Sequence, residues 1–179
     1  MRTLLLVLLA GLLAGCSVNA PQVDMVRRAI PEAKPDVDID PYAWTMEFNG
    51  AQLILYAVQA EDGTVFANRE GTQVGFDGTD VVLLRGMPGS LGSIRVRRGE
   101  GGVRTHVVSG LGEYAVRCDA PRRAGAVIVT ACEHEEAGRL LAFEHRVRMD
   151  EQGSIVEIEA VLIPGARPMR LTPLRTEEN

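Results

Sequence analysis

The stretch of sequence that decides the fold lies at residues 51–85 and reads AQLILYAVQAEDGTVFANREGTQVGFDGTDVVLLR. Short apolar runs alternate there with the dipeptides Asp62-Gly63, Glu70-Gly71 and Asp77-Gly78. Glycine supplies the positive φ that tight hairpin turns require, so each dipeptide predicts a turn between two strands. Turns at such regular spacing are typical of a β meander.

The same texture continues toward the C-terminus, and residues 94–97 and 143–149 alternate between polar and apolar side chains. Such alternation predicts strands that bury one face. The predicted fold class is therefore mainly β, an antiparallel meander that forms a large curled sheet, a half-barrel or a barrel, preceded by a short N-terminal helix and a flexible tether. The expected strands are Ala51–Ala60, Thr64–Asn68, Thr72–Phe76, Asp80–Arg85, Ser93–Arg97, Val103–Ser109, Glu113–Cys118, Ala126–Cys132, Leu140–Met149 and Ser154–Ile163.

The N-terminus has the pattern of a bacterial lipoprotein signal. Arg2 precedes an apolar run, which ends in Leu13-Ala14-Gly15-Cys16 and so resembles a lipobox. The run is shorter than the roughly 20 apolar residues that cross a bilayer. We expect residues 1–15 to be a signal peptide and Cys16 to carry the lipid anchor, more than one acyl chain being needed for stable attachment. The alternative is ordinary cleavage, with Cys16 as an incidental thiol.

Removal of residues 1–15 leaves 164 of the 179 residues, enough for one domain with a core. Residues 16–41 are rich in proline and charge and predict a lipidated tether with one short helix; residues 42–179 predict a single β-rich domain. The mature chain has a net charge of about −6, which argues against a nucleic-acid partner. Ser17 after the cysteine favours the outer membrane under the sorting rule of enteric bacteria.

Two further cysteines, Cys118 and Cys132, lie in a chain that the signal directs to an oxidising compartment. A disulfide between them is the leading prediction. The alternative is a catalytic or metal-binding pair, but the long spacing differs from the CxxC motifs that lower a thiol pKa or chelate a metal.

Two clusters superficially match metal sites. Asp36, Asp38, Asp40 and Glu47 have calcium-loop spacing, but Pro41 occupies the position that requires glycine. The cluster at 133–136, with His145 further along, is not a zincin motif, because Gly138 stands where the second histidine should be. We interpret it as a polar hairpin turn closed by that glycine.

The sequence also argues against two motifs of enzymes, the nucleophile elbow and the dinucleotide fingerprint. No serine of the sequence has the Gly-x-Ser-x-Gly setting of a nucleophile elbow. The glycines at 110 and 112 echo a dinucleotide fingerprint without its βαβ unit. We therefore predict no enzymatic activity, no cofactor and no metal.

Arg95, Arg97, Arg98 and Arg104 flank one turn and could form a basic patch for an acidic polysaccharide, since guanidinium groups pair with carboxylates at two points. The alternative is a solvated strand face, which the alternation of a strand explains equally well. Trp44, one of few aromatic residues, is expected to be a packing anchor rather than a sugar platform.

Several segments together resemble the group 4 capsule polysaccharide lipoprotein family. They are Pro41-Tyr42-Ala43, Leu53 to Val58, Glu61-Asp62-Gly63, Val65 to Gly71 and Val81 to Gly86. The resemblance implies a mostly β, non-enzymatic outer-membrane lipoprotein on the periplasmic face, which assists assembly or export of exopolysaccharide or capsule by contacting an outer-membrane export protein. The alternative function is a lipid- or glycan-binding carrier that uses a barrel cavity.

Overall fold

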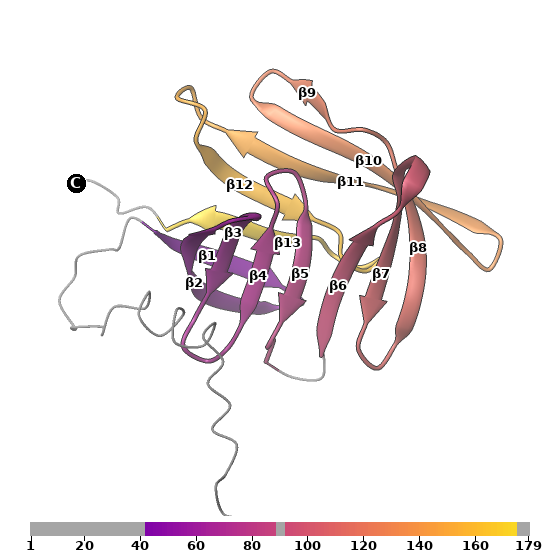
Figure 1. Cartoon of the computed structure of the whole chain (residues 1–179), viewed down its shortest axis with the longest axis horizontal. Helices are drawn as coiled ribbons and strands as arrows, with labels where there is room; N and C mark the ends of the chain where they lie inside the picture. Colours follow the sequence, from indigo (N-terminus) through magenta and orange to yellow (C-terminus); the bar gives the residue numbers. More distant parts are fainter. Residues whose placement is uncertain (1–41, 89–91, 175–179) are drawn as a thin grey trace, which may run out of the picture. The chain divides into compact units, whose positions relative to one another are not determined.

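The computed structural model describes residues 42–88 and 92–174, which form a closed antiparallel barrel (Figure 1). Twelve strands follow one another as a meander, β10 pairing with both β8 and β11, while β9 lies outside the ring as an extra strand on β10. The strands are β1 Ala43–Phe48, β2 Ala51–Ala60, β3 Gly63–Ala67, β4 Gln73–Phe76, β5 Val81–Arg85, β6 Ser93–Arg98, β7 Val103–Val108, β8 Gly112–Cys118, β9 Arg122–Ala124, β10 Val127–Glu136, β11 Arg139–Met149, β12 Ile155–Ala160 and β13 Met169–Pro173. The predicted fold class is confirmed, with the barrel closed.

All ten strands predicted from the sequence are present, with bounds that differ by a few residues. Three further strands, β1, β9 and β13, were not predicted. β1 pairs with β2 on one side and with β13 on the other, so the two ends of the domain meet inside the sheet. The predicted signal peptide, Cys16, tether, short helix and aspartates at 36, 38 and 40 lie outside the described residues.

A continuous apolar core inside the barrel takes buried side chains from β1–β7 and β11–β13. Inward residues alternate with outward ones along each strand, as the period of two requires. Trp44 packs edge-on against Phe66 with ring centroids 4.9 Å apart, which confirms its expected role as a packing anchor. The largest fully buried side chains include Phe66, Met46, Leu55, Leu84, Ile158, Leu162 and Leu171.

The three glycine dipeptides quoted above are the turns of successive hairpins. Gly63, Gly71 and Gly78 all have positive φ, and the pairing of β2 to β5 around them is antiparallel. Gly63 is the tightest, because a Cβ built on it would lie 2.2 Å from the carbonyl oxygen of Phe76. Gly78 has positive φ but open space around it.

We predict that Gly63→Ala lowers the free energy of unfolding by about 2 kcal/mol, because both the backbone strain and the overlap with Phe76 must be relieved. Gly78→Ala introduces the strain without the overlap and should cost less. Urea unfolding of both variants measures the difference. Equal losses would show that the close approach to Phe76 does not matter.

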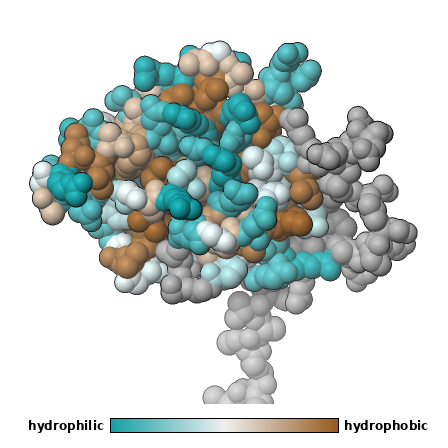
Figure 2. All heavy atoms as spheres, turned by 180° about the vertical axis from the view of Figure 1, so that it is seen from behind, coloured by the Kyte–Doolittle hydropathy of each residue, from teal (hydrophilic) through white to brown (hydrophobic). Residues whose placement is uncertain are grey.

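The outer surface is mixed in character. Figure 2 shows hydrophilic residues interspersed with small hydrophobic patches over one face. On β11 to β13, Glu157 forms ion pairs with Arg148 and Arg170, and Arg170 forms a second ion pair with Glu159. Within residues 42–88 and 92–174, no helix has the length and apolar character needed to cross a membrane.

Candidate functional site

The four arginines singled out in the sequence do not share one face. Arg98 and Arg104 are opposite each other in the β6–β7 ladder, and Arg104 is buried inside the barrel. Arg95 and Arg97 lie on the face of β6 opposite to Arg98, which is the outer face. There Arg97 forms an exposed ion pair with Glu113. The expectation of one four-arginine patch is therefore wrong, because consecutive strand residues point to opposite sides. Glycan binding by the outer pair stays a prediction.

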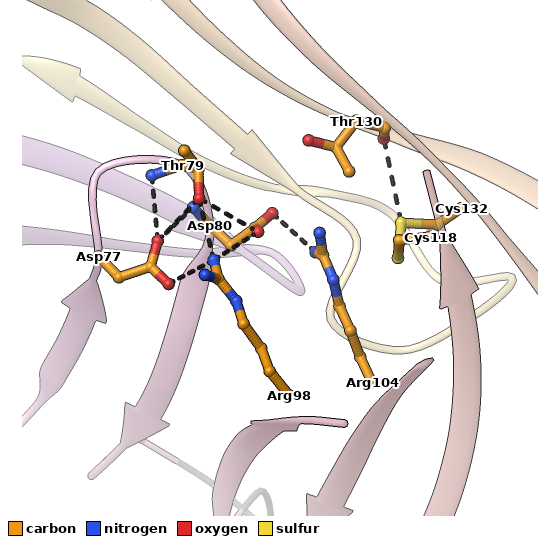
Figure 3. A network of polar contacts seen from close by, with 8 residues as sticks. All are labelled: Asp77, Thr79, Asp80, Arg98, Arg104, Cys118, Thr130 and Cys132. Carbon is orange, nitrogen blue, oxygen red and sulfur yellow. Dashed lines mark hydrogen bonds and ion pairs between the residues drawn. A yellow bond between two sulfur atoms is a disulfide. The ribbon is translucent and has the colours of Figure 1, made fainter. Parts of the chain in front are cut away.

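Arg98 and Arg104 both contact the buried carboxylate of Asp80. Arg104 Nη1 lies 2.8 Å from Asp80 Oδ1, and Arg98 Nη2 donates to Asp80 Oδ2 at 3.0 Å (Figure 3). The Asp80 and Arg104 side chains are only 2% and 8% exposed, whereas Arg98 is 53% exposed. No N–H of Arg104 is aligned with Oδ1, so this contact is an ion pair rather than a directed hydrogen bond.

The turn before β5 holds this carboxylate in place. Asp77 Oδ1 accepts hydrogen bonds from the backbone N–H groups of Thr79 at 3.0 Å and Asp80 at 2.9 Å. This local bonding is the usual reason for aspartate at the start of a turn. Asp77 Oδ2 also lies 2.5 Å from Arg98 Nη2, so turn and strand β6 are tied together.

An open pocket of about 570 Å³ lies over this network. Its lining includes Asp80, Arg98 and Arg104 together with the 99–102 turn, Cys118 and the loop 119–121. Residues of both the buried ion pair and the cystine therefore line this pocket.

Cys118 and Cys132 form the predicted disulfide, which is confirmed. They are directly opposite each other on β8 and β10, and the described part of that ladder consists of this pair and Arg117 opposite Glu133. The other neighbouring strands share longer ladders; β7 and β8, for example, are paired from Val103 to Val108. The bridge thus lies at the shortest contact in the ring, which we call the β8–β10 seam.

Two histidines are buried beside the seam. His106 Nδ1 lies 3.2 Å from the carbonyl oxygen of Leu162, to which the Tyr114 hydroxyl also donates, and its ring stacks on Tyr114. His145, on β11, is 4% exposed, and neither of its ring nitrogens has a hydrogen-bond partner among the described residues. Its ligand nitrogen and the two cystine sulfurs lie within 4.8 Å of one another.

Burial lowers the pKa of both histidines. For His145 the pKa falls from 6.5 to about 4, chiefly through desolvation, while Asp80 raises it and the charges of Arg104 and His106 lower it. For His106 desolvation is again the largest cause and outweighs the raising effect of the Leu162 carbonyl. Both rings are therefore neutral at pH 7.

A depressed histidine pKa makes the fold acid-sensitive. The unfolded chain binds a proton at His145 below pH 6.5 and the native state only near pH 4, so stability falls as the pH drops through this window. We predict a loss of about 2 kcal/mol from this group at pH 5 relative to pH 8. In His145→Leu, urea unfolding from pH 8 to 4.5 should show a shallower decline, and an unchanged slope would contradict the assignment.

Sequence reasoning missed Asp80, His106 and His145 as members of one cluster. Strand alternation gives the inward direction of the two histidines, whereas Asp80 lies in the turn before β5, and only the closed ring brings this turn, β7 and β11 together. The cluster at 133–136 is the end of β10 rather than a turn; the turn itself is Ala137-Gly138. His134 there donates to the Ala115 carbonyl of β8 at 2.8 Å.

Comparison of the chain with protein-family models, with curated proteins and with solved structures found no match. The membership in a capsule lipoprotein family expected from the sequence therefore stays a prediction.

Proposed function

We propose that the protein is a non-enzymatic lipoprotein of the outer membrane, anchored through Cys16 and facing the periplasm, which assists assembly or export of exopolysaccharide or capsule by contacting a protein of the export system. The lipobox-like N-terminus and the sequence resemblance to the group 4 capsule polysaccharide lipoproteins support this proposal. These two features support the proposed membrane location and the proposed role in polysaccharide export. The barrel supports the proposed way in which the protein contacts its partner.

The proposed mode of contact rests on the pairing of β8, whose ladder with β7 is long and whose ladder with β10 is short. Residues 112–116 of this strand are paired on the β7 side, whereas its described ladder to β10 is confined to the last two residues, and beyond it the His134 side chain donates to the Ala115 carbonyl. The β10–β11 hairpin continues past this short ladder and projects beyond β8 (Figure 1). An incompletely paired edge is a template for an added strand from a partner.

The packed interior favours contact over carriage. A carrier would need room inside the barrel, but buried side chains such as Met46, Phe66 and Leu171 form one cluster across its apolar part. The pocket at the barrel end is lined by charged and small residues, which suits neither an acyl chain nor an extended apolar ligand.

In-cell photocrosslinking tests the proposed contact. A photoreactive residue replaces Ala115, exposed on β8, or Glu47, which is exposed on β1 and paired with β13 on one side and β2 on the other. We expect an adduct with an outer-membrane export protein at position 115, little at position 47, and loss of the adduct in the Cys16→Ala background. Equal adducts at both positions, no exporter adduct, or normal surface polysaccharide in a deletion strain would overturn the proposal.

A further inference from the structure

The seam holds three side chains that together make a metal-ligand set. Cys118, Cys132 and His145 come from three successive strands of the ring, β8, β10 and β11, and their ligand atoms lie within 4.8 Å of one another. All three are buried. In the oxidised state described here the sulfurs are bonded to each other and cannot bind a cation.

His145 is the independent sign of a ligand role. Both of its ring nitrogens are buried without a hydrogen-bond partner among the described residues, which costs free energy that a purely structural side chain of similar size would avoid. A neutral imidazole with an available lone pair is the form that binds metal. Its neighbours include the ring of Phe143, 5.6 Å away, and the two sulfurs, and the charges of Asp80 and Arg104 act on it.

We propose that, once a dithiol reduces the Cys118–Cys132 disulfide, the two sulfurs and His145 bind one thiophilic divalent cation such as Zn²⁺. In the first step two electrons and two protons pass from the dithiol to the cystine, and the donor becomes a disulfide. In the second step both cysteine thiols release their protons to solvent, and two thiolates and one imidazole ligate the cation.

Charge and access both suit such a site. Two thiolates and a divalent cation sum to zero charge, so a buried complex leaves no net charge in the barrel. Two cysteines and one histidine are a common ligand set for zinc, with a fourth position open to water or another ligand. Cys118 is among the residues that line the pocket, so the proposal has the dithiol and the cation approach from this side. Metal binding would then replace the covalent closure of the seam by a coordinate one.

Cobalt spectroscopy on the full chain carrying Cys16→Ser tests this inference, since only the seam cysteines then remain. After anaerobic reduction and removal of the reductant, one equivalent of Co²⁺ should give thiolate-to-metal charge transfer and the intense visible bands of a tetrahedral site. Zn²⁺ should displace it. The oxidised protein should show neither signal.

His145→Ala should weaken Zn²⁺ binding by at least about tenfold, measured by competition with a chromophoric chelator. The matched control is His134→Ala, which removes a half-buried histidine that bonds the Ala115 carbonyl across the same seam but lies outside the ligand group, and it should leave affinity unchanged. Circular dichroism establishes that each reduced variant is folded, and the same titration in urea gives the affinity of the unfolded chain. Absence of binding, equal affinity in His145→Ala, or equal affinity in urea would overturn the proposal.

Discussion

Asp80→Asn is expected to lower the free energy of unfolding by about 3 to 5 kcal/mol, because it leaves the Arg104 guanidinium buried without its counter-charge. Arg104 is 8% exposed and Asp80 is its ion-pair partner in the barrel. Arg98 cannot compensate, since it carries the same sign of charge and contacts the same carboxylate. Urea or thermal unfolding at pH 7 measures the loss.

Two control variants distinguish the effect of losing a buried ion pair from the effect of losing any ion pair. Glu113→Gln removes the carboxylate of the exposed Arg97–Glu113 pair on the same hairpin region and should cost less than about 1 kcal/mol. The double change Asp80→Leu with Arg104→Met replaces both buried charges by apolar groups and should recover much of the loss. A loss for Asp80→Asn as small as that for Glu113→Gln would contradict the assignment of a buried, dependent ion pair.

The strands could be predicted because their signals are local. Glycine turns at 63, 71 and 78 and the alternation along β6 and β11 depend on neighbours in sequence, and the structure has strands at all ten predicted places. β1 and β13 were missed because their stability comes from pairing with each other across the whole domain. That pairing has no sequence signature, and it is also what makes an open curled sheet into a ring.

The features of the site likewise divide into those that the sequence predicts and those that depend on the closed barrel. The disulfide was predicted from the number of cysteines and from the oxidising compartment that the signal-like N-terminus leads us to expect. The split of the arginines also could have been anticipated from the period of two, which places Arg97 and Arg98 on opposite faces. By contrast, nothing in the sequence links His145 to Asp80 and Arg104, because β11 comes near β5 and β7 only after closure.

Loss of the disulfide is the second large effect we expect. Cys118 and Cys132 are 14 residues apart, and removing a cross-link of this loop length costs about 3 kcal/mol in the chain-entropy model. Cys118→Ala with Cys132→Ala should therefore lower the free energy of unfolding by about that amount, as should reduction of the wild type in the absence of metal. Urea unfolding measures both.

The loss should also be local, because the bridge lies on the shortest ladder of the ring. Hydrogen exchange in the double variant should rise first at β8 and at the facing part of β10, while β3 and β4, paired along nearly their whole length on both sides, keep their protection. The full exchange pattern distinguishes two roles for the bridge. A uniform rise would mean that it acts only on the unfolded chain, whereas opening confined to the seam would mean that it is what keeps the barrel closed, and a barrel that opens there exposes the same strand edge that we propose a partner uses.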